Sequence, residues 1–386
     1  MTQNILRDGL YRTLDKIDYG TMTLHTPEGQ IRHFQGTKPG PEATLILNNW
    51  SVIRHMLLKG DTGFAEDYRA GLWDTPDLTA LITFGLKNDH AIQDYLFGNR
   101  IMNILARMSS FFKLNTVSGS RKNIHAHYDL GNRFYGLWLD PTMTYSSALF
   151  NHAGENLVQG QYNKYDRILE RLGKKSGRLL EVGCGWGGFA ERASDTGDYD
   201  LKSITISKAQ HDFAQERLKK RARIMLEDYR HQEGQFDHIV SIEMFEAVGE
   251  KFWPVYFSKL KKLLSRQGKA VIQTITIDDK HFDAYRTSGD MIRQHIFPGG
   301  MLPSPSRFAD EARKAGLKIT DRFDFGLDYA RTLQEWQTRF EAQLNDVRNL
   351  GFDDSFIRLW RFYLSACTAG FLTQRTDVMQ IELSHA

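Results

Sequence analysis

One stretch of twelve residues combines a buried strand, a glycine turn and the start of a helix. It reads Leu-Leu-Glu-Val-Gly-Cys-Gly-Trp-Gly-Gly-Phe-Ala over residues 179–190. The apolar residues before the turn suit a central parallel strand, and alternating glycines let the backbone approach a ligand closely. The helix that follows presents its N-terminus to the same place. This stretch therefore predicts an α/β sheet whose turn holds a nucleotide-like cofactor.

Two cofactors are compatible with this turn. Glycines at 183, 185 and 188 satisfy the dinucleotide fingerprint, which also requires an acid about 20 residues onward, at the end of the second strand. The expected second strand, residues 201–206, reads Leu-Lys-Ser-Ile-Thr-Ile and holds no acid. The alternative is an acid-x-Gly-x-Gly-x-Gly pattern that begins at Glu181, whose carboxylate reaches a ligand's amino group. That pattern suits S-adenosylmethionine, although a turn that only packs a helix on a sheet explains one or two of the glycines.

Length and composition indicate a globular protein. With 386 residues the chain is long enough for two domains, and its 41% hydrophobic and 25% charged residues are ordinary values. No apolar run approaches the roughly 18 residues that a membrane-spanning helix needs. Residues 1–8 lack the apolar core of a signal peptide. We therefore expect a cytoplasmic protein that is soluble or peripherally associated with a membrane.

Charge and cysteine content narrow the range of partners. The formal net charge of +3 is too small to predict a nucleic-acid partner. Two local basic clusters, in residues 219–223 and 259–266, are either solvated helix faces or attract anionic lipid headgroups. Two cysteines, Cys184 and Cys367, provide neither a disulfide framework nor a cysteine-based metal site. We expect no nucleic acid and no metal.

The chain changes character near residue 115. Residues 1 to about 108 mix strand-like runs with turn-rich segments and a helical pattern that begins near Asp77. Residues 113–123 are polar and rich in small residues, as exposed linkers are. The sequence thus predicts three parts: an N-terminal α+β domain over 1–115, a linker over 116–122 and a second domain over 123–386.

Beyond the linker the pattern predicts a doubly wound α/β sheet. Strand-like runs alternate with helical segments and fall at 178–183, 201–206, 236–242 and 268–277. Ligands bind such sheets outside the carboxyl ends of the strands, so residues that follow these strands should converge on one site. The last sixty or so residues are expected to form a helical, aromatic layer that covers the core.

Several motifs in a fixed order resemble those of the cyclopropane fatty acid synthases. They include His-Tyr-Asp-Leu-Gly-Asn at 127–132, Leu-Asp-Pro-Thr-Met-Thr-Tyr-Ser at 139–146, the glycine turn, Ile-Thr-Ile-Ser-Lys-Ala-Gln at 204–210, Met-Phe-Glu-Ala-Val-Gly at 244–249 and Phe-Pro-Gly-Gly-Met-Leu-Pro at 297–303. The resemblance covers residues 123–340 and implies a Rossmann-like class I methyltransferase fold. Phe-Ala-Glu-Asp-Tyr at 64–68 resembles part of the extra domain of bacterial members that act on phospholipids.

The resemblance implies methyl transfer from S-adenosylmethionine to the double bond of an unsaturated fatty acyl chain, often within a membrane phospholipid. Attack of the alkene on the sulfonium methyl leaves a carbocation, and loss of a proton from the new methyl closes a cyclopropane ring. Such a site must shield the cation from water, and aromatic faces stabilise cations by about 0.5 to 2 kcal/mol each. The aromatic content of 12% permits such a lining.

The resemblance assigns eight residues to the cofactor. Tyr145 and Ser146 are assigned to the methionine part, and Gly183 and Gly185 to the backbone-facing side. Thr205 and Gln210 are assigned to the ribose, and Asp228 and Tyr229 to the adenine. Two of them also have purely structural explanations, because Thr205 can end a strand and Asp228 can cap a turn. Their convergence at strand ends favours ligand binding.

In the synthases a bound bicarbonate removes the proton, held by a cysteine after the Tyr-Ser pair, a glutamate, a histidine and a tyrosine. Glu246 matches the glutamate and Tyr329 the tyrosine, whereas Ser147 replaces the cysteine and Gln273 replaces the histidine. Ser147 serves equally well if the backbone N–H is what matters. Gln273, however, carries no charge and cannot exchange a proton. These replacements put bicarbonate binding in question.

Glu243 stands where many relatives have glycine. If its side chain points into the site, its carboxylate repels an anion or acts as the base itself; if it points outward, it is solvated. The product is therefore left open between a cyclopropane ring and a methyl-branched or methylene chain. A partner reductase would saturate a methylene group.

The expected substrate is an unsaturated phospholipid or fatty acyl chain at the inner face of the membrane. The N-terminal domain resembles one that assists dimerisation and membrane docking, which predicts a homodimer. The alternative is a catalytically silent lipid- or cofactor-binding protein on the same fold, and its support is the altered pair Ser147 and Gln273. A small-molecule or nucleic-acid methyltransferase is disfavoured because the chain lacks a basic stripe interleaved with aromatic residues.

Overall fold

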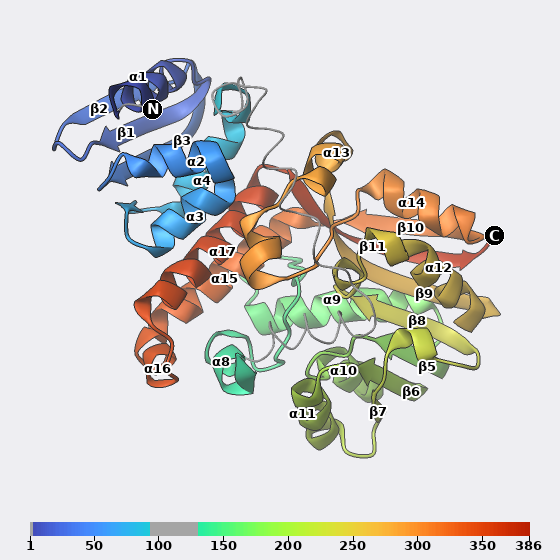
Figure 1. Ribbon diagram of the computed structural model, residues 1–386. Helices are drawn as coiled ribbons and strands as arrows, with labels where there is room; N and C mark the ends of the chain where they lie inside the picture. Colours follow the sequence, from blue (N-terminus) through green and yellow to red (C-terminus); the bar gives the residue numbers. More distant parts are fainter. Residues whose placement is uncertain (1–2, 93–129) are drawn as a thin grey trace. The chain divides into compact units, whose positions relative to one another are not determined.

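The computed structural model describes residues 3–92 and 130–386, which fall into two compact units (Figure 1). The smaller unit comprises the described part of Met1–Phe112, with Ala284–Ile296 and Leu344–Gln374. The larger unit comprises the described part of Lys113–Asp283, with Phe297–Gln343 and Arg375–Ala386.

This division differs from the expected domains in two segments. Residues 284–296 and 344–374 belong to the smaller unit, although the sequence analysis assigned them to the second domain. Sequence order misleads here because the chain returns twice to the smaller unit. The expected linker, residues 116–122, and the boundaries on either side of it lie outside the described residues.

The smaller unit is an α+β structure. Its elements are α1 (Gln3–Leu14), β1 (Tyr19–His25), β2 (Ile31–Gln35), β3 (Lys38–Leu47), α2 (Ser51–Lys59), α3 (Asp61–Arg69), β4 (Trp73–Asp74), α4 (Leu78–Lys87), α16 (Leu344–Asn349) and α17 (Asp354–Leu372). The sheet has the order β2-β1-β3-β4. The helix expected from Asp77 is present as α4, and the Asp77 carboxylate caps it by accepting from the N–H of Ala80 at 2.8 Å.

The larger unit contains a seven-stranded sheet flanked by helices. Its elements are α8 (Gly131–Trp138), α9 (Leu157–Leu172), β5 (Ser176–Val182), α10 (Gly188–Thr196), β6 (Asp198–Thr205), α11 (Lys208–Leu218), β7 (Arg223–Leu226), β8 (Phe236–Ile242), α12 (Trp253–Leu263), β9 (Leu264–Ile277), the start of α13 (Asp279–Thr287), α14 (Pro305–Lys314), β10 (Leu317–Asp324), α15 (Gly326–Ala342) and β11 (Thr376–His385). The four strands expected from the sequence are β5, β6, β8 and β9.

The strand order identifies where a ligand would bind. The sheet runs β10-β11-β9-β8-β5-β6-β7, and the five strands from β9 to β7 are parallel. The chain moves outward from β5 through β6 to β7, then returns to β8 and continues to β9 on the other side. Right-handed crossovers therefore place α10 and α11 on one face and α12 on the other. Ligands of doubly wound sheets bind at this reversal, between the carboxyl ends of β5 and β8.

Apolar burial holds α9, α10 and α11 against the parallel strands. One core cluster joins Ile168 and Leu172 of α9, Leu179 of β5 and Val240 of β8, all almost fully buried. Continuous apolar runs such as these are expected where helices cover both faces of a parallel sheet. The buried strands thereby hold their carboxyl ends in fixed positions.

The expectation of a helical C-terminal layer is wrong for the last residues. Residues 376–385 form β11, which pairs antiparallel with β9 and with β10. Burial on both faces removes the strict alternation that would have marked this strand. None of the described helices combines the length and apolar character that crossing a bilayer requires.

Asn88, which follows α4, links this helix to the start of β1. Its Oδ1 accepts from the backbone N–H groups of Asp18 and Tyr19 at 2.9 and 3.0 Å, and its Nδ2 donates to the carbonyls of Tyr19 and Phe84 at 2.9 and 3.0 Å. We expect Asn88→Ala to lower the free energy of unfolding of the smaller unit by about 2 to 4 kcal/mol, because buried backbone groups lose their partners.

Urea denaturation with hydrogen exchange at the Asp18 and Tyr19 amides measures this loss. The control is Asn48→Ala, which removes one exposed hydrogen bond to the carbonyl of Gly71 and should cost less than about 1 kcal/mol. Equal losses in the two variants would contradict the assigned role of Asn88.

Candidate active site

The glycine turn lies at the end of β5. Gly183, Gly185 and Gly187 have φ values of 88°, 52° and 86°, which side chains rarely adopt. A Cβ at Gly183 would lie 3.0 Å from the Met244 side chain, and one at Gly187 would lie 3.0 Å from Leu218. A Cβ at Gly185 would meet no described atom within 4 Å. The backbone at Gly185 is therefore open to a ligand, while its neighbours allow close packing.

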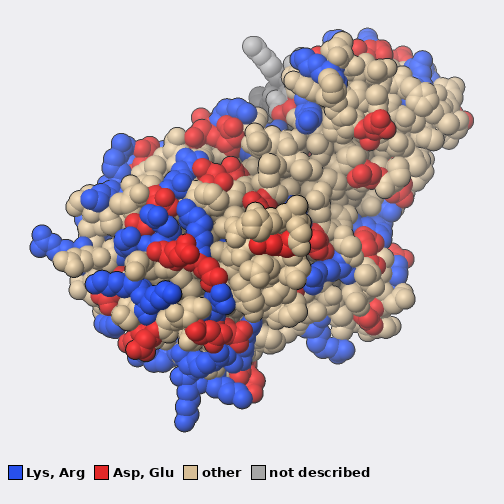
Figure 2. All heavy atoms as spheres, turned by 180° about the vertical axis from the view of Figure 1, so that it is seen from behind, with Lys and Arg blue, Asp and Glu red and all other residues tan. Residues whose placement is uncertain are grey.

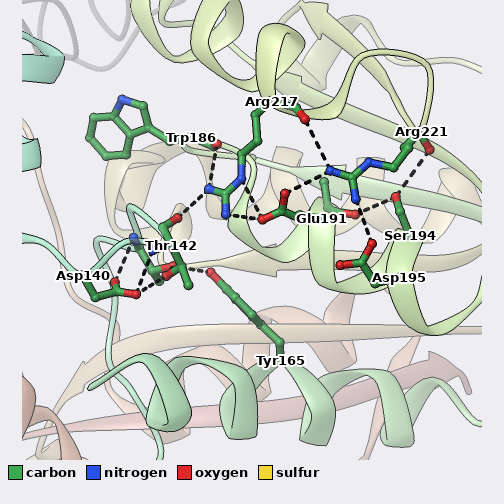
Figure 3. A network of polar contacts seen from close by, with 11 residues as sticks. Asp140, Thr142, Tyr165, Trp186, Glu191, Ser194, Asp195, Arg217 and Arg221 are labelled. Atoms are coloured by element: carbon green, nitrogen blue, oxygen red, sulfur yellow. Dashed lines mark hydrogen bonds and ion pairs between the residues drawn. The ribbon is translucent and has the colours of Figure 1, made fainter. Parts of the chain in front are cut away.

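A polar network fixes the segment that leads to Tyr145 and Ser146 (Figure 3). The buried Asp140 carboxylate accepts from the N–H of Thr142 at 2.9 Å and from its hydroxyl at 2.5 Å. The Thr144 hydroxyl contacts the Tyr165 hydroxyl at 2.7 Å. A Cβ on Gly188 would come within 2.9 Å of both of these hydroxyls, so this glycine is required for packing.

Arg217 of α11 ties the same segment to the turn. Its guanidinium donates to the Thr142 carbonyl at 2.7 Å and to the Trp186 carbonyl at 3.5 Å, and it pairs with Glu191 of α10 (Figure 3). Arg221 pairs with Glu191 as well, and with Asp195. The basic cluster expected at 219–223 is thus partly neutralised by acids.

The residues assigned to the ribose and adenine lie at the carboxyl ends of β6 and β7. Thr205 donates its hydroxyl to Gln210 Oε1 at 2.9 Å. The buried Asp228 carboxylate accepts from the Arg230 guanidinium at 2.8 and 2.6 Å and from its backbone N–H at 2.9 Å, and Tyr229 follows it directly. These side chains stand at the edge of the sheet where the turn also lies, as the parallel strand ends require.

Glu181 lies inside β5, beneath the turn. Its carboxylate is 2% exposed and accepts from the Ser203 hydroxyl at 2.6 Å. Burial raises the pKa of Glu181 to about 7, while the Ser203 hydrogen bond opposes this rise. The hydrogen bond to Ser203 connects β5 to β6 just below the cofactor turn.

Glu243, the residue after β8, points its carboxylate into the larger unit. Oε1 accepts from the Ser147 N–H at 2.9 Å and from Gln273 Nε2 at 2.7 Å, and Oε2 accepts from the Tyr329 hydroxyl at 2.6 Å. The backbone of Glu243 has a φ of 49°, a conformation that costs a residue with a side chain about 1 to 2 kcal/mol. A strained backbone that presents one carboxylate to three donors indicates a functional side chain.

Gln273 is itself oriented by a chain of amides. Its Oε1 accepts from Gln380 Nε2 at 2.9 Å, and Gln380 Oε1 accepts from the Arg167 guanidinium at 2.8 Å. This relay leaves the Gln273 NH₂ group to face Glu243. The sequence analysis missed Gln380 because it expected helix where β11 lies, although polar Gln380 and Glu382 recur two residues apart within an apolar run.

Glu246 lies beside this carboxylate. Its Oε1 accepts from the Ile275 N–H at 2.6 Å and from the Thr274 hydroxyl at 2.9 Å, while its buried Oε2 has no hydrogen-bond partner among the described residues. Burial raises the pKa of Glu246 to about 8, and the charge of Glu243 adds to the rise. Glu246 is therefore largely protonated at neutral pH.

Burial also raises the pKa of Glu243. Four groups oppose this rise: the Tyr329 hydroxyl, the charge of Lys164, the Ser147 N–H and the Gln273 amide. The arrangement can hold one proton between two carboxylates, so Glu243 can serve as an acceptor for a proton. Lys164, which the sequence analysis did not identify, is fully buried on α9.

Aromatic rings gather around Tyr145. Its ring centroid lies 5.3 Å from that of Trp336, 5.4 Å from Tyr135 and 5.5 Å from Trp138. Tyr329, the donor to Glu243, lies edge-on to Trp336 at 6.0 Å. Tyr329, which binds Glu243, and the segment assigned to the methionine part therefore share one aromatic cluster, which suits a reaction with a cationic intermediate.

Known proteins resemble this chain in sequence and in fold. The family model described as mycolic acid cyclopropane synthetase matches residues 116–381. Tuberculostearic acid methyltransferase UfaA1 of Mycobacterium tuberculosis is 36% identical over 345 residues, which cover 86% of this chain and 80% of that protein. The cyclopropane-fatty-acyl-phospholipid synthase of Escherichia coli is 32% identical over 354 residues, with coverages of 89% and 88%. The solved structure of mycolic acid cyclopropane synthase CmaA1 complexed with SAH and CTAB has a TM-score of 0.64 and 31% identity, and covers 68% of this chain and 97% of that one.

The open position at Gly185 allows a test of cofactor binding. We expect Gly185→Ala to reduce affinity for S-adenosylhomocysteine about tenfold or more, because an added methyl group in ligand-filled space costs about 1 to 3 kcal/mol. Isothermal titration calorimetry measures the affinity.

The control is Gly351→Ala in the smaller unit. Gly351 also has a positive φ, 96°, and a Cβ there would meet no described atom within 4 Å. Both variants should lose about 1 to 2 kcal/mol of stability from backbone strain, but only the first should lose affinity. Unchanged affinity in Gly185→Ala would exclude the turn as the cofactor site.

Proposed function

The chain belongs to the mycolic acid cyclopropane synthetase family, and we propose that it methylates the double bond of an unsaturated fatty acyl chain with Glu243 as the base. It is an S-adenosylmethionine-dependent methyltransferase. The observation that carries the proposal is the set of three hydrogen bonds that Glu243 accepts from Ser147, Gln273 and Tyr329. In the family pattern, the corresponding groups hold bicarbonate.

The residues present fit S-adenosylmethionine. Gly185 offers an open backbone position, and the segment with Tyr145 and Ser146 is fixed by the Asp140 and Arg217 network. When bound, this cofactor supplies the electrophilic methyl group. The chain's own residues would position the cofactor at the turn, orient the alkene toward it and keep water from the cation through the aromatic rings around Tyr145.

The residues do not fit bicarbonate in the same way. Ser147, Gln273 and Tyr329, the three donors that would hold bicarbonate, already bind the carboxylate of Glu243. A second anion beside Glu243 would be repelled by its negative charge. The Glu243 carboxylate can accept hydrogen bonds as bicarbonate does, and it is already part of the chain. We therefore derive no step through bicarbonate.

Hydrogen-bond counting identifies the basic atom. A carboxylate oxygen accepts about two hydrogen bonds; Oε1 of Glu243 already accepts two, and Oε2 accepts one from Tyr329. Counting only donors from the described residues, Oε2 keeps one lone pair for a proton, and we assign the proton to this atom. In the proposed step, after methylation, a hydride moves from the carbon that carries the new methyl group to the neighbouring cationic carbon. A C–H bond of the methyl group then breaks, its electron pair forms the double bond of a methylene group, and the proton moves to Oε2. Without the hydride shift, loss of a proton from a chain carbon next to the cation gives a methyl-branched alkene. The raised pKa of Glu243 strengthens it as a base.

We favour a methylene or methyl-branched product over a ring. A base fixed by a short side chain replaces one that the family holds as a separate ion, so the proton is taken from a different position. The name of one relative, tuberculostearic acid methyltransferase, supports this choice. The proposal includes a partner reductase, because saturating a methylene group requires two electrons that this chain does not supply.

A phospholipid substrate at the inner face of the membrane is the second part of the proposal. It is supported by the name of the Escherichia coli relative, which acts on fatty acyl phospholipid. The basic cluster at 219–223 supports it little, because Arg221 and Arg223 pair with acids and blue and red side chains lie side by side over much of the face in Figure 2. Peripheral association and a homodimer thus rest on the resemblance of the N-terminal domain.

The catalytically silent alternative depended on Ser147 and Gln273. Both residues donate to the carboxylate of Glu243, so both replacements have a place in a working site. The curated relatives are themselves named as methyltransferases and synthases.

Substitution of Glu243 tests the base directly. We expect Glu243→Gln to lower turnover about 100-fold or more, since it removes a general base, with little change in affinity for S-adenosylhomocysteine.

Turnover is measured with methyl-labelled S-adenosylmethionine and monounsaturated phospholipid, and the acyl chains are analysed by mass spectrometry and NMR. The acyl chains from the wild-type reaction should carry a methyl or methylene branch and remain unsaturated. Exposed Glu233 provides the control Glu233→Gln, which should keep full turnover. No labelled lipid from the wild-type protein would refute the proposed activity, and a ring would refute the proposed product.

A double variant tests the origin of the product. Glu243→Gly relieves the backbone at its positive φ of 49° and removes the built-in carboxylate, and Gln273→His adds a group that exchanges protons. We expect the combination, with added bicarbonate, to shift the product toward cyclopropane, as measured by NMR of the acyl chains. An unchanged product distribution would show that Glu243 does not determine the product.

A further inference from the structure

Lys164 is a fully buried lysine for which the reaction as described above assigns no role. It lies on α9 with 0% exposure, and its Nζ donates to the Ser146 hydroxyl at 2.7 Å. The ammonium also lies 4.5 Å from the centroid of the Tyr165 ring. A hydroxyl and an aromatic ring do not offset the cost of burying a full positive charge, so the charged form of Lys164 depends on a negative charge nearby.

Two carboxylates act electrostatically on Lys164, namely Glu243 and Asp140. The Asp140 carboxylate is already bonded to Thr142 by two hydrogen bonds. Glu243 and Lys164 bind adjacent residues of one segment: Ser146 accepts from Lys164 through its hydroxyl, and Ser147 donates its N–H to Glu243. The lysine and the proposed base thus hold the same two-residue segment.

We propose that Lys164 is a positioning residue whose charge keeps Glu243 ionised and whose hydrogen bond holds the Ser146–Ser147 segment against it. This inference rests on the proposed function, in which Glu243 is the base. Lys164 would then supply a buried positive charge to a site in which neutral Gln273 replaces the histidine of the family.

The surrounding charges explain why such a cation is needed. Glu243 faces Lys164, the Tyr329 hydroxyl and the carboxyl of Glu246, and a negative charge on Glu246 would favour protonation of Glu243. Gln273 donates a hydrogen bond but carries no charge. Without Lys164, burial beside a second carboxyl would favour the protonated form of Glu243, and a protonated carboxyl cannot act as a base.

Burial lowers the pKa of Lys164 to about 7, although Glu243 and Asp140 raise it. Two limits on activity follow. As the pH falls through the raised pKa of Glu243, the base is lost; as it rises through that of Lys164, the cation that orders the segment is lost. A variant without the cation should therefore need a higher pH to ionise Glu243.

The test compares Lys164→Met with a matched change one turn earlier on the same helix. Gln161 is also fully buried and donates through Nε2 to the Ser146 carbonyl at 3.0 Å. Lys164→Met and Gln161→Met each remove one hydrogen bond to Ser146, and only the first removes a charge. We expect Lys164→Met to move the acidic limb of the pH profile of kcat/KM upward by about one pH unit or more. Gln161→Met should lower activity without moving the limb, and Lys164→Arg should keep it near its wild-type position.

An infrared measurement separates this inference from the proposed function and needs no turnover. The carboxylic acid band that Glu243→Gln removes should appear at higher pH in Lys164→Met than in the wild-type protein. Lys164→Gln serves as the second neutral variant if the methionine variant does not fold. An identical titration of that band with and without the lysine charge would overturn the role of Lys164. Full turnover by Glu243→Gln would instead overturn the proposed role of Glu243 as the base. The infrared titration would still report whether Lys164 lowers the pKa of Glu243.

Discussion

The carboxylate of Glu243 joins three separate parts of the chain. Ser147 comes from the segment before α9, Gln273 from β9 and Tyr329 from α15, and each donates one hydrogen bond to this group. The doubly wound sheet makes the meeting possible, because β5, β8 and β9 end at the same edge. The glycine turn follows β5 and Glu243 follows β8, so the proposed cofactor site and the proposed base lie on either side of the reversal in strand order.

Electrostatics and strain determine what this carboxylate can do. A left-handed backbone at a residue with a side chain is tolerated because the three donors fix the side chain. Glu246 has an unpartnered oxygen among the described residues, and burial and the charge of Glu243 raise its pKa to about 8. Glu243 has three hydrogen-bond donors and the charge of Lys164 to oppose the rise of its own pKa, so we propose that Glu243 is the ionised member of the pair.

The sequence allowed the local elements to be predicted, and the resemblance named Ser147, Gln273 and Tyr329, which the structure brings together around Glu243. Glycine spacing located the turn, and apolar runs located β5, β6, β8 and β9, because each is a property of neighbouring residues. The direction of the Glu243 side chain could not be predicted, since it depends on partners 96, 30 and 86 residues away. Lys164 and β11 were missed for a related reason: a buried lysine in a helix and a strand buried on both faces resemble ordinary helical sequence.

Glu243 is proposed to serve as the chain's own base in place of a bound ion. The most direct measurement is turnover of the wild-type protein on monounsaturated phospholipid in buffer stripped of carbon dioxide, before and after bicarbonate is added. We predict the same rate and the same product in both conditions. A rate that falls when bicarbonate is removed and recovers when it is restored would contradict the account.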